Sequence, residues 1–85
     1  MNQAIQFPDR EEWNEAECVL HFPAMVNGML LTCIIPGYVL ASRFGGETTA
    51  QWLAAFRQQR WDLEDEAEQL ILQQQEDDQW RVWLA

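Results

Sequence analysis

The sequence contains no lysine, one histidine and one serine, and these shortages limit the chemistry that it could perform. An acid–base mechanism near neutral pH would have to use His21, because imidazole is the side chain whose ordinary pKa lies in that range. The usual patterns for metal, phosphate and nucleophile sites, such as H-E-x-x-H, C-x-x-C, the P-loop and G-x-S-x-G, do not occur. The sequence therefore predicts no catalytic residue, no metal ligand and no cofactor.

The chain is also short of basic charge. Five arginines stand against 14 carboxylates, and the formal net charge is −9. A surface of this sign repels phosphate backbones and anionic lipid, so we expect neither a nucleic acid nor a membrane as a ligand. No stretch approaches the roughly 18–20 apolar residues of a membrane span, no signal peptide is recognisable, and two cysteines are too few for a secreted disulfide framework. These features predict a cytoplasmic protein.

Apolar residues, by contrast, are plentiful. They form 48% of the 85 residues, which is enough for one packed core and too much for a disordered acidic tail. We therefore expect a single domain over residues 1–85, present as a monomer or a weak homodimer.

The most informative local signal is Asn27-Gly28, a dipeptide favoured in type I′ turns, between two apolar and partly β-branched runs. It predicts a hairpin in which Val26 faces Met29 and Phe22 faces Cys33. The predicted core face has no charged residue and consists of Cys18, Leu20, Phe22, Ala24, Val26, Met29, Leu31, Cys33 and Ile35. The opposite face is more apolar than solvent contact requires, and we expect part of it to be covered; it carries Val19, His21, Pro23, Met25, Leu30, Thr32 and Ile34. Because His21 lies away from both thiols, no Cys–His pair is predicted.

Shorter elements are predicted on both sides of the hairpin. Ile5 and Phe7 alternate with a polar residue, as in a strand. Asp9 and Glu12 resemble a helix start and predict one helical turn over residues 10–14. After the hairpin, residues 38–44 are predicted to form a short helix that ends at the following glycine pair.

The chain beyond residue 48 is predicted to be mainly helical. Thr48 and Gln51 match a capping box, and the apolar positions that follow stay in phase over residues 49–75. One unbroken helix would be roughly 40 Å long, whereas a domain of this size has a radius of gyration of about 12 Å. We therefore favour a break between residues 59 and 62, with Asp62 as the second N-cap. A single kinked helix is the alternative.

The last residues alternate between apolar and polar side chains and predict a closing strand that contains Trp80, Val82 and Leu84. The predicted fold class is α+β. It consists of a small antiparallel β-sheet, made of the N-terminal strand, the central hairpin and the C-terminal strand, with two or three helices packed on one face.

Two of the five tryptophans do not fit the predicted core. Trp52 and Trp80 match the apolar pattern, whereas Trp61 and Trp83 lie out of phase with it. Tryptophan is enriched at binding hot spots, and Trp61 is followed by a strongly acidic segment. We therefore predict a candidate interaction surface that contains Trp61, Trp83, Arg57, Arg60, Glu64, Asp65 and Glu68.

Several runs resemble one known family along nearly the whole chain. These runs are AIQFPDREEW, FPAMVNGMLLTC, RFGG and QWLAAFRQQRWDLEDEAE. In their order and spacing they resemble the YrdB-like family of small bacterial proteins, a domain-of-unknown-function group. The resemblance implies a compact α+β fold and a cytoplasmic setting, and it transfers no catalytic or binding role to any residue.

The favoured hypothesis is a non-enzymatic protein-interaction or accessory module that binds an unidentified protein through an exposed aromatic and apolar patch or through the acidic helix. A second hypothesis is a small metal-dependent or acid–base enzyme module that uses His21 or the carboxylates of Glu64 and Glu68. A third is an acidic mimic of nucleic acid that inhibits a nucleic-acid-binding protein.

Overall fold

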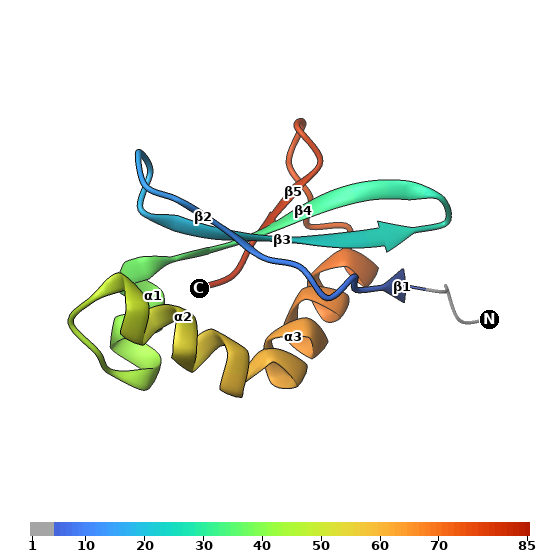
Figure 1. Ribbon diagram of the computed structural model, residues 1–85. Helices are drawn as coiled ribbons and strands as arrows, with labels where there is room; N and C mark the ends of the chain where they lie inside the picture. The colour runs from blue at the N-terminus through green and yellow to red at the C-terminus, as the bar shows by residue number, and fades with distance from the viewer. Residues whose placement is uncertain (1–4) are drawn as a thin grey trace.

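The computed structural model describes residues 5–85, so the first four residues of the predicted domain lie outside the described residues. Five strands and three helices follow one another along this part of the chain (Figure 1). The strands are β1 (Ile5–Gln6), β2 (Glu12–Asn14), β3 (Val19–Val26), β4 (Met29–Pro36) and β5 (Arg81–Trp83). The helices, all between β4 and β5, are α1 (Gly37–Phe44), α2 (Thr49–Gln58) and α3 (Arg60–Leu72).

The β3–β4 hairpin is the centre of the sheet, and its predicted register is confirmed. Val26 pairs with Met29 and Phe22 with Cys33, and Asn27 and Gly28 both have the positive φ that a type I′ turn requires. β1 and β2 pair antiparallel with β3, and β5 pairs with the other side of β4. The α+β class is confirmed, with one correction. β5 runs parallel to β4, because the three helices carry the chain back before β5 begins.

All three helices lie on one side of the sheet, and the core fills the space between the two layers (Figure 1). Leu20, Phe22 and Ile35 of the hairpin are buried against the apolar side chains of the helices, among them Phe56 and Leu63. The predicted core face is thus confirmed for the middle of the hairpin. It is wrong at both ends, because Cys18 and Met29 are exposed.

Residues 12–14 form the strand β2 and not the predicted helical turn. Trp13 pairs with Leu20 of β3, and its ring packs against that of Trp52, with 6.0 Å between ring centroids. The turn from β2 into β3 places Cys18 in the left-handed region, with φ 55°, so the alternation that would have turned its thiol inward begins only at Val19. A strand partner for the first half of β3 outweighs the local capping signal of Asp9 and Glu12.

Pro23 explains why β1 and β2 are two strands and not one. The register of the hairpin directs the backbone groups of alternate residues of β3, Pro23 among them, away from β4 and toward β1 and β2. Proline has no N–H to donate, so it interrupts the pairing at this point. The connecting residues bulge away from β3, and the Arg10 N–H donates to the Pro8 carbonyl at 2.8 Å to close a tight turn.

The helical segment is divided as expected. The Thr48–Gln51 capping box is present, α2 ends at Gln58, and α3 begins at Arg60. The predicted second N-cap is wrong by one turn: Gln59 occupies the N-cap position, and Asp62 lies in the first turn of α3. Trp80 is also misplaced by the sequence pattern. It precedes β5 with φ 60° and its side chain is 51% exposed, so only Val82 and Leu84 of the predicted apolar set are in the core.

Candidate functional site

The side of the sheet away from the helices is here called the outer face. Strand alternation and register direct a mixed set of apolar and polar side chains toward it: Gln6, Glu12, Asn14, Val19, His21, Pro23, Met25, Leu30, Thr32, Ile34, Pro36, Arg81 and Trp83. The end of this face away from the Asn27-Gly28 turn is covered by the chain itself, because Val19 and Ile34 are buried. Toward the hairpin end and along β5 the apolar surface is open, since Leu30 is 53% and Trp83 is 44% exposed. The expectation that this face is partly covered is therefore confirmed only for the end away from the hairpin turn.

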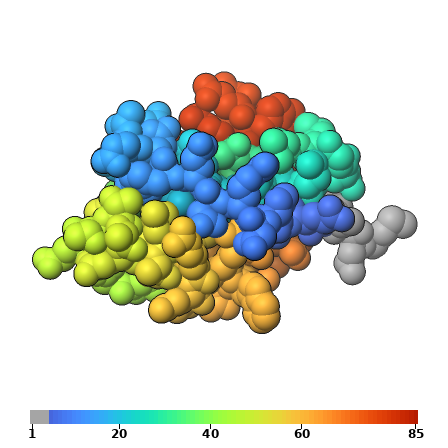
Figure 2. All heavy atoms as spheres, viewed as in Figure 1, coloured from blue at the N-terminus to red at the C-terminus, as the bar shows by residue number. Residues whose placement is uncertain are grey.

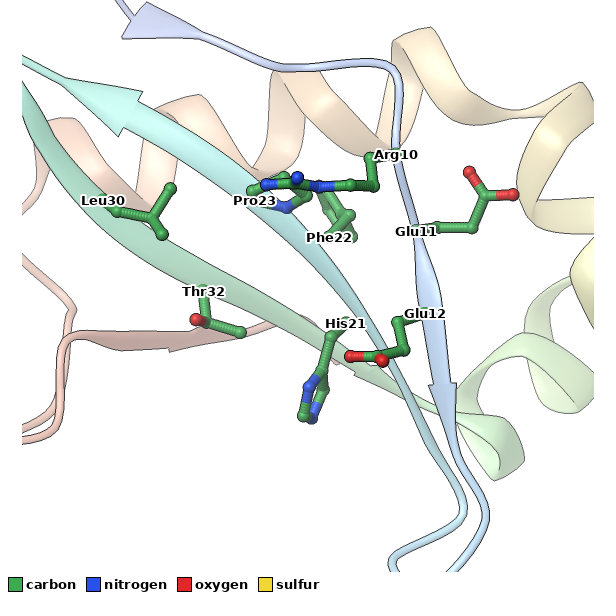
Figure 3. Close-up of a pocket in the computed structure, with 8 residues that line it drawn as sticks. All are labelled: Arg10, Glu11, Glu12, His21, Phe22, Pro23, Leu30 and Thr32. Atoms are coloured by element: carbon green, nitrogen blue, oxygen red, sulfur yellow. The ribbon is translucent and has the colours of Figure 1, made fainter.

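A shallow groove of about 440 Å³ crosses the outer face where β1 and β2 are interrupted. Its lining residues are Arg10, Glu11, Glu12, His21, Phe22, Pro23, Leu30 and Thr32 (Figure 3). Glu12 and His21 lie side by side on neighbouring strands, and Arg10 and Pro23 line the same groove (Figure 3). The His21 Nε2 atom is buried and has no hydrogen-bond partner among residues 5–85. His21 lies across the sheet from Cys33, as predicted, so these two side chains form no pair.

The loop between α3 and β5 borders the outer face on the β5 side and is organised by Asp77. The Asp77 carboxylate accepts hydrogen bonds from the backbone N–H groups of Gln79 and Arg81, the Arg81 guanidinium and the Trp83 indole, at 2.9–3.3 Å. Burial alone would raise the pKa of Asp77, but these donors outweigh it and lower the pKa to about 2. The Asp77 N–H also donates to the Arg81 carbonyl, so the loop occupies backbone groups on the free edge of β5.

Trp83 is fixed in place by the same loop. The Arg81 guanidinium lies 5.3 Å from the centroid of the Trp83 ring, and the Trp83 Nε1–H donates to Asp77. A surface tryptophan that is already oriented loses less conformational freedom on binding than a free side chain.

Arg60 and Glu64, both predicted for the interaction surface, belong to an internal ion-pair cluster. The Arg60 guanidinium donates to Glu11 and Glu64, each at 2.8 Å, and to the carbonyls of Pro8 and Arg10. Its side chain is only 12% exposed. Arg57 donates to the same Glu11, and this hydrogen bond, followed by that of Arg60, lowers the pKa of Glu11 against the effect of burial. The cluster ties the β1–β2 connection to α3.

The remaining predicted residues are divided between the two layers of the molecule. Trp61 is 84% exposed in the first turn of α3, with Asp65 and Glu68 further along that helix. Trp83 lies on the outer face, so the seven predicted residues do not form one surface. The sequence did place Met25 and Leu30 on the outer face, but it did not single them out, because nothing local shows which face the helices cover. It missed Glu12, Arg10 and Asp77 as part of the surroundings of this face.

Two further observations concern residues 5–85. No group of three or more His, Cys, Asp and Glu side chains is arranged so that it could bind a metal ion. Within the same residues, no helix combines the length and the apolar character needed to cross a membrane.

The chain belongs to the family described as protein of unknown function (DUF1488), whose model matches residues 5–84. Among curated relatives, the uncharacterized protein YrdB of Escherichia coli (strain K12) is 68% identical over 84 residues, which cover 99% of each chain. The uncharacterized protein YrdB of Shigella flexneri is 67% identical over the same length. The resemblance seen in the sequence is therefore confirmed.

A solved structure confirms the fold. The crystal structure of a DUF1488-family protein of unknown function from Shewanella loihica PV-4 matches with a TM-score of 0.87 and 34% sequence identity. The match covers 99% of this chain and 94% of that one.

Proposed function

We propose that the protein is a non-enzymatic, cytoplasmic protein-interaction module and that the outer face is its contact surface. The observation that carries this proposal is the open apolar part of that face: none of the three helices within residues 5–85 covers it, and Leu30 and Trp83 are exposed on it. Exposed large apolar side chains on an accessible sheet face are typical of contact surfaces. Trp83 has in addition the orientation and the residue type of a binding hot spot.

The two alternatives from the sequence receive less support. An acidic mimic of nucleic acid requires free carboxylates along α3, and two of the five carboxylates on that helix are paired, Glu64 with Arg60 and Glu66 with Arg43. An acid–base mechanism through the Nε2 atom of His21 is disfavoured, because that atom is buried. We therefore keep the interaction module as the proposal.

Photo-crosslinking in the native cell tests the proposal directly. A photoreactive amino acid is placed at position 30 on the outer face or, in a matched chain, at position 72 on the helix layer. Leu30 is 53% and Leu72 is 47% exposed, so both positions accept a new side chain at similar cost to the fold. We expect crosslinked protein adducts from position 30 and few from position 72. Equal yields from both positions, or adducts from position 72 alone, would contradict the proposal.

A further inference from the structure

We infer that the partner segment that docks on the outer face is basic and carries an apolar stripe. This inference rests on the proposed function and adds to it the chemistry of the partner. It follows from the charges that the chain carries on the same side of the sheet as the open apolar area.

Two projections rise from the sheet on the side away from the helices: the β2–β3 turn, residues 15–18, and the α3–β5 loop, residues 73–80 (Figure 1). In the space-filling view the loop stands between this turn and the end of the hairpin (Figure 2). Both projections are acidic. The β2 strand with its turn contributes Glu12, Glu15 and Glu17, and the loop contributes Glu76 and Asp78 in addition to Asp77.

These carboxylates are not neutralised by arginines of the chain. Asp77 is paired with Arg81, whereas the other five have no arginine partner among residues 5–85. Near the same face, Arg10 is the one arginine without a carboxylate partner within residues 5–85. The five unpaired carboxylates, here called the rim, are Glu12, Glu15, Glu17, Glu76 and Asp78. They outnumber the one unpaired arginine, and this excess of negative charge attracts a partner of positive charge and speeds its encounter.

The same charges argue against two other occupants. A second copy of this chain, which also carries a net charge of −9, would place an acidic rim against an acidic rim. An anionic membrane surface would be repelled in the same way. A segment whose apolar stripe meets Met25, Leu30 and Trp83, and whose basic side chains meet the rim, is complementary to both the open apolar area and the acidic charges.

The inference is tested with a synthetic 18-residue amphipathic helix that has leucine on one face and lysine on the other. We expect it to bind, with backbone NMR shifts concentrated at Met25, Leu30, Thr32 and Trp83. Two control peptides separate the contribution of positive charge from that of the apolar stripe. A peptide with glutamate in place of lysine should not bind measurably, and a scrambled leucine–lysine peptide without an apolar stripe should bind at least fivefold more weakly.

A pair of charge-matched variants locates the binding charge. E12Q/E15Q/E17Q removes three rim carboxylates, and D62N/D65N/E68Q removes three from α3; each changes the net charge from −9 to −6. We expect the rim variant to weaken binding of the leucine–lysine peptide about three- to tenfold. The α3 variant should stay within twofold of the wild type. Circular dichroism and urea unfolding verify that both variants are folded.

Several outcomes would overturn the inference: no binding of the leucine–lysine peptide, equal binding of the glutamate peptide, equal weakening by both variants, or NMR shifts on α3. The crosslinking experiment distinguishes failure of the inferred basic partner from failure of the proposed function. If position 30 still gives adducts in the cell, the outer face remains the contact surface and only the basic character of the partner is refuted. If position 30 gives none, the proposed function fails as well.

Discussion

At the scale of single residues, Arg60 shows how a side chain that looks like surface charge in the sequence can be structural. It is the second residue after Gln58, the last residue of α2, and one guanidinium reaches two carboxylates and two backbone carbonyls. It also lies 5.2 Å from the centroid of the Phe56 ring. Since the carbonyls are about 50 positions earlier in the chain, no local pattern could have revealed these contacts.

Replacing Arg60 by lysine should destabilise the fold although the charge is kept. Lysine cannot supply the fork that bonds the carbonyls of Pro8 and Arg10 while also pairing with Glu11 and Glu64, so we expect a loss of about 2 kcal/mol in the free energy of unfolding. Arg57→Lys is the matched control, because Arg57 binds the same Glu11 but its side chain is 61% exposed. It should cost no more than about 0.5 kcal/mol. Urea unfolding measures both, and equal losses would refute this role of Arg60.

The two cysteines should differ in reactivity. Cys18 is exposed, whereas Cys33 is buried, and burial together with the nearby Glu64 carboxylate raises the pKa of the Cys33 thiol to about 12. A thiol with that pKa has almost no thiolate at pH 8. We expect a thiol reagent to modify one cysteine quickly in the native protein and the second only after unfolding. Rapid modification of both, with Cys18→Ser still reacting, would contradict the position of Cys33.

At the scale of secondary-structure elements, the sequence predicts best where a local rule and the pattern agree. Asn27-Gly28 specifies a turn length, and that length fixes every pair of β3 and β4. The capping box at Thr48 likewise fixes the start of α2. Both rules involve residues that are close together in the chain.

Prediction fails where the partner is distant or the backbone turns unexpectedly. β2 is a strand because β3 is beside it, and the parallel direction of β5 depends on three intervening helices. The exposure of Cys18 and Trp80 follows from the left-handed backbone conformation of each residue. Neither residue is a glycine, so the sequence gives no signal of this conformation. For the candidate site, the sequence identified Trp83 and the half-apolar face but could not combine them, because it does not show which strands are neighbours.

The α3–β5 loop should respond to pH through Asp77. Its pKa is about 2 in the folded protein, below the ordinary value of about 3.9 for an unfolded chain. A carboxyl group of this kind stabilises the fold fully above the unfolded pKa, and the contribution is lost as the pH falls toward the folded value. The stability difference between wild type and Asp77→Ala should therefore be largest at pH 5–7 and shrink between about pH 4 and 2.

Asp78→Ala, which removes the neighbouring exposed carboxylate, serves as the control in these unfolding measurements. We expect it to change stability less than Asp77→Ala at pH 7, since Asp78 makes none of the hydrogen bonds that organise the loop. A pH-independent difference between wild type and Asp77→Ala would rule out the ionised Asp77 as the organising group.

At the scale of the whole molecule, the two layers of the fold have different tasks. The helix layer buries one face of the sheet and forms the core, and the Arg60 cluster attaches the β1–β2 connection to it. The outer face has an open apolar area toward the hairpin end and along β5, on the side of the sheet from which the two acidic projections rise. The layered arrangement separates Trp61 from Trp83. Substitutions at the exposed leucines therefore test the two layers separately, Leu30 the outer face and Leu72 the helix layer.

The most direct test of the central claim compares two variants in the native cell. Tagged Leu30→Asp and Leu72→Asp chains each place one new charge at a half-exposed leucine, and the proteins that co-purify with each are quantified against the wild type. If the outer face is the contact surface, the amount of the specific partner that co-purifies falls at least tenfold with Leu30→Asp and stays at the wild-type amount with Leu72→Asp. A partner that Leu30→Asp retains, or that both variants lose equally, would contradict the account.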